Sequence, residues 1–258
     1  MHLFLSPQFD DAVLSCGGKI HQLADAGQVV TVRTVMGQNP KNVPDTPIVR
    51  ELHTRWRGGN DPVAARIQED EAAVRSLGAL PQRMTVWADC IYRQSRGGSA
   101  LYPSQESVFG NVHTDDMAGT LIPTIVLPPR EDIKIMYAPL AAGHHVDHLI
   151  VRDWALELQR QNPSVAFKFY EDYPYGENAG AVDLALFFFK ENGFKLELET
   201  VTLNDASVEA KIRAIGQYRT QLGSFWTSVE AMRQAVLRHL LRAGGGKPAE
   251  RYWCVLPQ

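Results

Sequence analysis

The sequence is poor in cysteine and carries no excess of positive charge. Its three cysteines, Cys16, Cys90 and Cys254, are an odd number and lie far apart. This spacing suits neither a disulfide framework nor a CxxC metal site, and it favours a reducing compartment. The formal net charge of −3 and the pI near 6.2 provide no polycation for a nucleic-acid backbone or an anionic membrane surface. We therefore expect a small-molecule partner and no nucleic acid.

The sequence also lacks long hydrophobic runs. The N-terminal apolar run, Leu3–Leu5, is far shorter than the roughly 7 to 15 residues of a signal-peptide core, and no stretch reaches the ~18 residues of a membrane helix. We expect a cytoplasmic protein without a membrane span. The 258 residues, 45% of them hydrophobic, can bury a sizeable core. We interpret residues 1–258 as a single domain, compatible with a monomer or a homo-oligomer.

Alternating strand and helix signals predict an α/β fold. His2–Ser6 has the composition of a short buried strand, Asp11–Ala26 carries apolar residues at helical spacing, and Val29–Val35 is β-branched. A strand, a helix and a strand within about 35 residues form a βαβ unit with a right-handed crossover. We therefore expect a Rossmann-like fold, with a mostly parallel central sheet and helices on both faces.

The rest of the chain continues this alternation. Further strands are predicted at Met84–Trp87, Ile133–Ala138, Val165–Tyr170, Lys195–Leu203 and Arg251–Leu256. Further helices are predicted at Ile48–Trp56, Pro62–Leu77, Met117–Ile125, Val146–Gln161, Ala179–Asn192, Val208–Gln221 (capped by Asp205) and Val229–Ala243. Two long loops, Gly37–Pro62 and Ile91–Thr120, are expected to form pocket walls, because loops of that length are usually functional.

Residues of the kinds that bind metals follow two of the predicted strands. Gln8, Asp10 and Asp11 come after the first strand, and His145 and His148 come after the strand that ends at Ala138. Ligands in open α/β sheets bind outside the carboxyl ends of the strands, so the two groups are expected to meet. Histidines three positions apart at a helix start share one face, and together with carboxylates they suit a divalent metal such as zinc.

Each group taken alone has a simpler interpretation. An aspartate pair after a strand is most often a helix N-cap followed by a first-turn charge that the helix dipole favours. Adjacent aspartates cannot share a helix face, however, which suggests that one binds while the other moves a proton. The occurrence of both groups at strand ends favours a functional site.

The two groups resemble the motifs of a known family, the PIG-L/LmbE-type zinc-dependent de-N-acetylases. The first family motif is proline, histidine, any residue and two aspartates, then a hydrophobic run and two glycines; here it stands as Pro7–Gly18. The second is His-x-Asp-His, here His145–His148. Further similarities lie at Arg66–Gly78, Asp89–Arg93, Tyr170–Tyr175 and Lys211–Gln221. The resemblance implies a hydrolase that removes acetyl groups from N-acetylglucosamine or other amino sugars and glycoconjugates.

The resemblance also implies a role for each matching residue. It makes Asp11 and His148 zinc ligands and Asp10 the general base, while His145 stabilises the oxyanion or protonates the leaving amine. The resemblance implies that Arg66 and Asp89 bind the sugar, and that Tyr92 and Arg93 lie next to them in the sugar site. Zinc lowers the pKa of its bound water toward ~7 and polarises the amide carbonyl, which is consistent with this chemistry.

Gln8 departs from the family pattern, because it occupies the position of the first histidine ligand. A carboxamide is a neutral, weaker donor that suits zinc less well than imidazole does. Three explanations are open: a deliberate replacement of histidine, a natural protein that binds metal weakly or not at all, or a site of different composition. The alternative to a hydrolase is therefore a non-catalytic, carbohydrate-binding relative that has lost the metal. A nucleotide-binding Rossmann protein is disfavoured, because the first turn has no GxGxxG motif.

Overall fold

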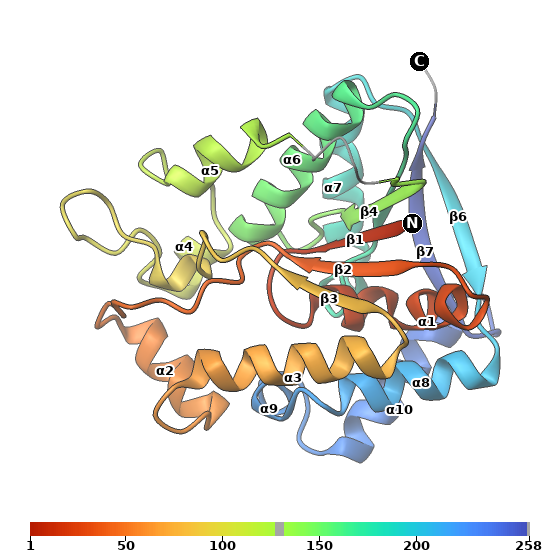
Figure 1. Ribbon diagram of the computed structural model, residues 1–258, viewed down its shortest axis with the longest axis horizontal. Helices are drawn as coiled ribbons and strands as arrows, with labels where there is room; N and C mark the ends of the chain where they lie inside the picture. Colours follow the sequence, from red (N-terminus) through yellow and green to blue (C-terminus); the bar gives the residue numbers. More distant parts are fainter. Residues whose placement is uncertain (127–131, 257–258) are drawn as a thin grey trace.

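One seven-stranded sheet organises the protein (Figure 1). The structure is a computed structural model that describes residues 1–126 and 132–256. The strands are β1 (His2–Ser6), β2 (Val30–Thr34), β3 (Leu80–Arg83), β4 (Ile135–Pro139), β5 (Ala166–Tyr170), β6 (Leu196–Thr202) and β7 (Ala249–Val255). Their order is β3-β2-β1-β4-β5-β7-β6, in which β1 to β5 run parallel and β7 runs antiparallel to both β5 and β6.

Helices cover both faces of this sheet (Figure 1). The α-helices are α1 (Asp11–Asp25), α2 (Pro47–Trp56), α3 (Pro62–Ser76), α4 (Gln105–Val108), α5 (Met117–Leu121), α6 (Val146–Gln161), α7 (Ala179–Glu191), α8 (Asp205–Ile215), α9 (Arg219–Phe225) and α10 (Val229–Ala243). Short 3₁₀ turns are η1 (Cys90–Tyr92), η2 (Ile122–Thr124) and η3 (Tyr175–Glu177). Helices α1, α3, α8 and α10 pack on one face and α6 and α7 on the other. The expected Rossmann-like, mostly parallel sheet with helices on both faces is confirmed.

The alternation of side chains along β1 separates the two halves of the core. Phe4 points to the face covered by α1 and α8 and stacks on Tyr137 of β4, whereas Leu3 and Leu5 point to the face covered by α6. All three are fully buried. A central parallel strand that is covered on both faces is expected to be continuously apolar, as this one is.

Two predicted elements were wrong. The third strand is not Met84–Trp87 but β3, whose residues are mostly exposed and pair with β2 through their backbone. This edge strand has little hydrophobic alternation to reveal it. The predicted helix Val208–Gln221 is two helices, α8 and α9, which are separated at Gly216–Tyr218, and the cap of α8 is Asn204, not Asp205.

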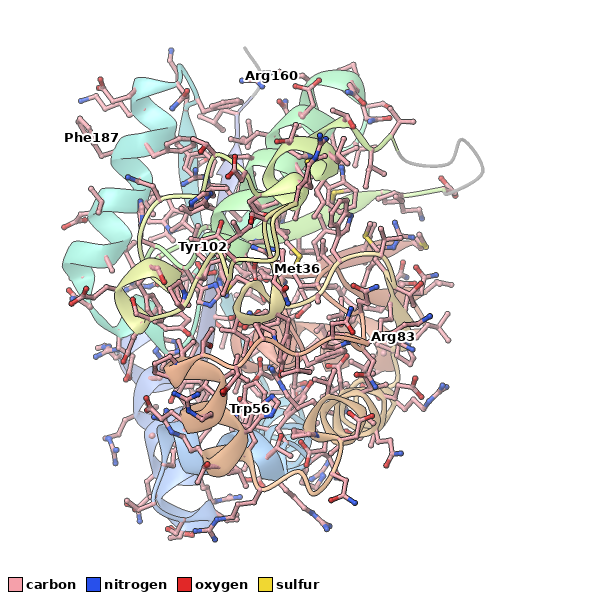
Figure 2. All side chains as sticks on the ribbon, turned by 90° about the vertical axis from the view of Figure 1, so that its left-hand side faces the viewer. Met36, Trp56, Arg83, Tyr102, Arg160 and Phe187 are labelled. Carbon is pink, nitrogen blue, oxygen red and sulfur yellow. The ribbon has the colours of Figure 1, made fainter. Side chains whose placement is uncertain are left out.

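The central position of β1 is the feature that locates the site. From β1 the chain continues to β2 and β3 on one side, then crosses over to β4 and β5 on the other. The crevice at such a topological switch point is where doubly wound sheets bind ligands. Both groups of candidate residues lie there, after β1 and after β4. Figure 2 faces this loop-rich end and labels Trp56 of α2 and Tyr102 of the long loop after η1.

A search of the helices among residues 1–126 and 132–256 found none with the length and apolar content needed to cross a bilayer.

A buried ion pair forms hydrogen bonds with the backbone of α1. Glu250 of β7 accepts hydrogen bonds from the amides of Gly18 and Lys19 at 2.9 Å each, and its partner Lys211 donates to the Ser15 carbonyl at 3.0 Å. The Lys211 and Glu250 side chains lie 2.7 Å apart and are almost completely buried. Because Leu203 and the Glu250 carboxylate approach the helix so closely, the residue at position 18 has no room for a side chain.

We expect Gly18→Ala to destabilise the protein by about 1–3 kcal/mol, the usual cost of overpacking. A Cβ at Gly18 would lie 2.3 Å from a Leu203 methyl and 3.1 Å from a Glu250 oxygen. The matched control is Gly223→Ala in α9, where a Cβ meets no described atom within 4 Å. This control should be neutral or stabilising by up to about 1 kcal/mol. Urea unfolding measures both, and equal stabilities would contradict the close approach.

Candidate active site

The turn between β1 and α1 holds three of the candidate residues together. Ser6 Oγ donates to the Gln8 carbonyl at 2.6 Å and accepts from Ala12 N at 3.0 Å, while Gln8 N donates to Asp11 Oδ2 at 2.7 Å. Asp10 has a φ of 100°, a backbone conformation that is strained for a residue with a side chain. Such strain persists only where surrounding contacts impose it, and it occurs preferentially at functional sites.

Asp11 and His148 form a close buried pair, and the segments that carry them meet as expected from their positions after β1 and β4. Asp11 Oδ1 lies 3.3 Å from His148 Nε2. Two donor atoms that each lie about 2.0–2.1 Å from a tetrahedral ion are about 3.3 Å apart, so this distance fits two ligands of one metal. On the other side of the ring, Asp172 Oδ1 lies 2.6 Å from His148 Nδ1, and Ala142 N donates to Asp172 Oδ2 at 2.9 Å. A carboxylate behind a histidine is the usual support of a metal ligand.

The electrostatics of this pair are dominated by burial and mutual attraction. Burial raises the pKa of Asp11, but His148 outweighs it and the resulting pKa is lowered. Burial lowers the pKa of His148, but Asp11 and Asp172 outweigh it and raise the pKa well above the usual range. A cation between these carboxylates is therefore favoured, and a bound metal ion would take over that role from the proton.

Asp10 lies on the wall of the cavity next to Asp11, with no side-chain hydrogen bond to any residue in the described ranges 1–126 and 132–256. Burial and the neighbouring Asp11 raise its pKa well above the usual value, although Arg66 opposes the shift. A carboxylate with a raised pKa and free oxygens is suited to accept a proton from water. The two adjacent aspartates thus have different environments, with the pKa raised at Asp10 and lowered at Asp11.

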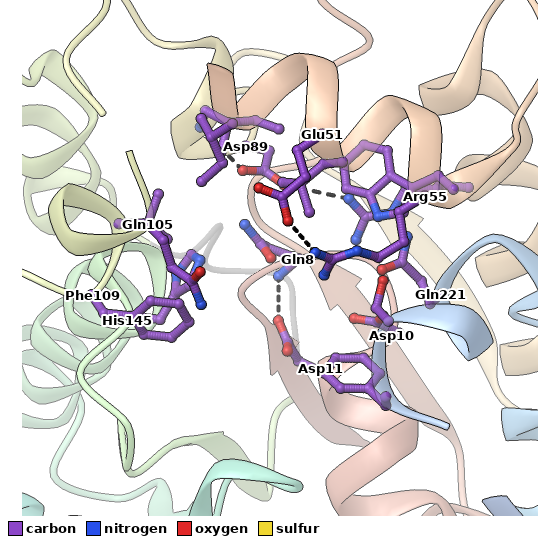
Figure 3. Close-up of a pocket in the computed structure, with 18 of the residues that line it drawn as sticks. Gln8, Asp10, Asp11, Glu51, Arg55, Asp89, Gln105, Phe109, His145 and Gln221 are labelled. Carbon is purple, nitrogen blue, oxygen red and sulfur yellow. Dashed lines mark hydrogen bonds and ion pairs between the residues drawn. The ribbon is translucent and has the colours of Figure 1, made fainter. Parts of the chain in front are cut away.

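His145 caps α6 and faces the cavity across from Gln8 (Figure 3). Its Nδ1 accepts the Asp147 amide at 3.2 Å, so the proton of the neutral ring is on Nε2. Burial lowers the pKa of His145 to about 4, although Asp147 opposes the shift. The edge of the Phe109 ring packs against it at 5.3 Å between centroids. His145 is therefore a neutral hydrogen-bond donor at physiological pH.

Gln8 is fixed by a carboxylate on α6. Its Nε2 donates to Asp147 Oδ2 at 2.8 Å. Because an ionised carboxylate only accepts hydrogen bonds, the amide nitrogen of Gln8 faces Asp147 and the carbonyl oxygen Oε1 remains available at the cavity. A carboxamide held in this way can offer one oxygen ligand to a metal.

The cavity between these residues measures about 240 Å³. Its floor is polar and its walls come from α2, α4 and α9, with Trp56, Phe109 and Phe225 among the aromatic contributors. Glu51 and Arg55 of α2 form an ion pair at the wall (Figure 3). The long loops thus border the cavity, as the sequence predicted.

The expected sugar-binding residues occupy two different places. Arg66 lies 3.3 Å from Asp89, donates to the Phe9 carbonyl at 3.2 Å and stacks over Trp56 at 4.5 Å. With the Gln221 amide turned so that its oxygen faces Arg66, this oxygen accepts a hydrogen bond from Arg66 Nε at 2.9 Å. Three of the five Arg66 N–H groups thus have partners within the protein. Arg66 holds Asp89, and both residues border the cavity, where Asp89 can accept from a ligand.

Tyr92 and Arg93 are not among the residues that line this cavity. The Tyr92 hydroxyl lies 2.7 Å from His53 Nε2. Arg93 is buried between two carboxylates, with Nη2 at 2.9 Å from Asp116 and Nη1 at 2.6 Å from Asp147. The structure therefore gives these two residues contacts within the protein.

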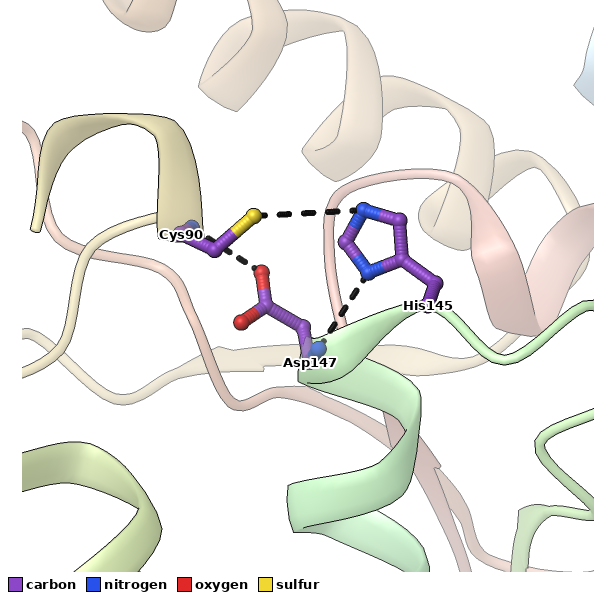
Figure 4. A group of neighbouring side chains, drawn as sticks. All are labelled: Cys90, His145 and Asp147. Atoms are coloured by element: carbon purple, nitrogen blue, oxygen red, sulfur yellow. Dashed lines mark hydrogen bonds between the residues drawn. The ribbon is translucent and has the colours of Figure 1, made fainter. Parts of the chain in front are cut away.

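Asp172 and Cys90 have no role in the sequence-based predictions, which include Tyr175 only in the similar segment Tyr170–Tyr175. Asp172 follows β5 at the carboxyl edge of the sheet, which is the signal that could have identified it, and Tyr175 packs on the His148 ring at 5.7 Å. Cys90 lies near His145 and Asp147 (Figure 4), and one ligand-type atom from each of the three falls within 4.8 Å of the others. No local pattern identifies this cysteine, because its partners lie more than fifty positions away in the chain.

Ligand-type atoms around this crevice thus indicate a metal. In the Cys90 cluster, Asp147 already accepts hydrogen bonds from Gln8 and from the Cys90 amide at 3.1 Å. Burial and Asp147 raise the pKa of the Cys90 thiol well above its usual value, so the thiol is protonated. Asp11 and Gln8 line the cavity, and Asp11 is paired with His148, which Asp172 supports. Asp11, His148 and the Gln8 oxygen are therefore the stronger candidates for a metal site.

Comparisons with known proteins agree with this chemistry. No model of a protein family matches the chain. The chain is 28% identical over 233 residues to a 2'-N-acetylparomamine deacetylase of Niallia circulans, covering 85% of this chain and 80% of the relative. It is 26% identical over 253 residues to a 2'-N-acetylparomamine deacetylase of Streptomyces fradiae, covering 97% of this chain and 80% of the relative. Among solved structures, the zinc-inhibited form of teicoplanin deacetylase Orf2 matches with a TM-score of 0.81 and 26% identity, covering 100% of this chain and 98% of that one.

The fold and the site define a homologue of N-deacetylases, with relatives of that class along nearly the whole chain. The resemblance to the PIG-L/LmbE-type deacetylases is thereby confirmed.

We expect the His145 ring of the metal-free protein to be neutral at pH 7, with its proton on Nε2 and a pKa near 4. Long-range ¹H–¹⁵N correlation NMR between pH 4 and 8 measures both properties, and His145→Gln assigns the resonance. The ring should gain charge only as the pH falls through the lowest part of this range. A proton on Nδ1, or a pKa near the unperturbed ~6.5, would contradict the capping geometry.

Proposed function

We propose that this protein is a metal-dependent hydrolase that removes the acetyl group from an N-acetylated amino sugar or glycoconjugate. The observation that carries the proposal is the convergence of Asp10, Asp11 and His145 on one cavity, with His148 paired to Asp11. Amide hydrolysis needs an activated water, a donor for the oxyanion and a proton for the leaving amine. These three side-chain groups can supply them.

The metal that we propose is zinc. Asp11 and His148 would hold it, and Gln8 would add a weak third ligand through Oε1, at the position where the family carries histidine. When bound, zinc supplies Lewis acidity to the amide carbonyl and lowers the pKa of a bound water. Three protein ligands leave a position open for water and substrate.

Asp10 is the general base in this proposal. It takes the proton of the attacking water, which is favoured by its raised pKa, and it then holds that proton as a carboxylic acid. When the carbon–nitrogen bond breaks, the same proton can pass to the departing amine. Because His145 is neutral at pH 7, we assign it to stabilising the oxyanion and not to protonating the amine. Its Nε2–H can donate a hydrogen bond to the oxyanion, whereas a general acid would need the protonated imidazolium.

The substrate class is supported by the cavity and by the relatives. Amino-sugar and glycopeptide deacetylases are the proteins that this chain resembles. Asp89 faces the cavity with an oxygen that can accept from sugar hydroxyls. Trp56 of α2, Phe109 after α4 and Phe225 of α9 offer aromatic surfaces against which sugar rings pack. Nothing in the comparisons favours a non-catalytic relative. A cytoplasmic location and a single domain remain predictions from the sequence.

We expect Asp10→Asn to lower kcat by about 10²–10⁴, the usual contribution of general base catalysis, while zinc affinity stays unchanged. Its matched control is the neighbouring Asp11→Asn, which should lose zinc as well as activity. Amine release from N-acetylglucosamine glycosides, with elemental analysis of the purified variants, measures both effects. Equal zinc loss in the two variants would contradict the division of roles between the aspartates.

We expect Gln8→His to strengthen zinc binding by about tenfold or more, equivalent to about 1.4 kcal/mol, and to raise the deacetylation rate. An imidazole can donate to Asp147 from Nδ1 and bind zinc through Nε2, which makes it a better ligand than a carboxamide. Competition with a chromophoric chelator measures the affinity. If both forms bind a sugar while neither binds zinc nor releases amine, the hydrolase proposal is wrong and the carbohydrate-binding alternative holds.

A further inference from the structure

We propose that Arg93 is a positioning residue for the metal site, acting on Gln8 through Asp147. The inference rests on the metal site proposed above. The sequence instead predicts that Arg93 borders the sugar. In the present inference, the long loop after η1 holds Arg93 in place and so supports the metal site.

The first step is the contact between Gln8 and Asp147. The Asp147 side chain is completely buried, and its Oδ2 accepts from Gln8 Nε2 at 2.8 Å and from the Cys90 amide at 3.1 Å. A carboxylate can only accept, so it binds the NH₂ end of the amide and leaves the oxygen end for the cavity. Asp147 therefore decides which atom Gln8 presents to a metal.

The second step is the charge that keeps Asp147 in place. A buried carboxylate without a compensating cation is strongly unfavourable. Arg93 Nη1 lies 2.6 Å from Asp147 Oδ1, as an ion pair outside hydrogen-bond geometry, and the arginine side chain is 7% exposed. Without Arg93, Asp147 would have to turn toward other donors, and the Gln8 amide would lose its fixed orientation.

The third step is the anchoring of Arg93 itself. Its Nε donates to Asp116 Oδ2 at 3.0 Å, its Nη1 donates to the Ala88 carbonyl at 3.0 Å, and its guanidinium lies over the Tyr102 ring at 5.3 Å. The Tyr102 hydroxyl also donates to Asp116 Oδ2, at 2.8 Å. Asp116 and Tyr102 belong to the long loop between η1 and α5, so this loop holds Arg93 against α6.

The experiment measures Zn²⁺ affinity by chelator competition and the absorption spectrum of the Co²⁺ form, neither of which depends on activity. Arg93→Met keeps an unbranched side chain similar to the aliphatic part of arginine and removes the cation. We expect a loss of about 10–100-fold in Zn²⁺ affinity, the usual effect of removing a group that orients a ligand, together with a changed Co²⁺ spectrum. Gln8→Ala should weaken Zn²⁺ binding as well.

The decisive measurement is the double variant. If Arg93 acts only through Gln8, Arg93→Met should cause no further loss of Zn²⁺ affinity in the Gln8→Ala background. Additive losses would overturn the proposal, because they would mean that Arg93 supports the site by another route.

The matched control is Lys211→Met, which also removes a buried cation from a buried carboxylate, but at α1 and β7. It should lower thermal stability and leave Zn²⁺ affinity unchanged, whereas an equal loss of affinity in both variants would overturn a specific role. If Arg93→Met does not fold, Asp147→Asn takes its place, because asparagine can also donate and no longer selects one end of the Gln8 amide.

The remaining outcomes separate this inference from the proposed function. If Gln8→Ala weakens Zn²⁺ binding and Arg93→Met does not, the positioning role is wrong and the metal site stands. If Gln8→Ala has no effect but Asp11→Asn abolishes binding, Gln8 is not a ligand and the positioning role is also wrong. If Asp11→Asn has no effect either, the proposed metal site itself fails.

Discussion

The parallel pairing of β1 with β4 is the constraint on which the site depends. His2, Leu3 and Phe4 are in register with Ile135, Met136 and Tyr137, so both strands end at the same edge of the sheet. Residues about 140 positions apart in the sequence meet there, with Asp11 at the start of α1 and His148 in the first turn of α6. The backbone ladder and the apolar side chains on both faces of β1 fix this meeting. The catalytic groups therefore depend on a core that takes no part in the chemistry.

The charged side chains of the site are buried, and each therefore needs a partner. For this reason the site is a network of polar side chains that extends beyond the Asp11–His148 pair. Asp11, Asp147, Asp172 and His148 are each under a tenth exposed. A lone charge at such depth would be costly, and each of these groups has a partner of opposite sign or a donor at hydrogen-bond distance. The partners lie one layer behind the cavity, and they fix the rotamers and tautomers of the groups that face it.

Gln8 changes one ligand without disturbing the layer behind it. The carboxamide donates to Asp147 and leaves an acceptor for the cavity, which is the same division of donor and acceptor that an imidazole with a proton on Nδ1 provides. In the proposed metal site, Gln8 would therefore be a weaker ligand that a carboxylate on α6 still holds in place. The same turn contains the unusual backbone of Asp10.

The sequence by itself determined the fold class, several helices such as Val146–Gln161 and Val229–Ala243, and the residues Asp10, Asp11, His145 and His148, because these depend on local periodicity, caps and strand ends. It did not determine the edge strand β3, whose exposed side chains carry no pattern, nor the break between α8 and α9. Only the tertiary structure decided that Asp172 supports His148, that Arg93 faces Asp147 instead of the cavity, and that Cys90 lies beside His145. The partner of a buried charge is chosen by packing between elements far apart in the chain, and short-range sequence signals contain no information about that choice.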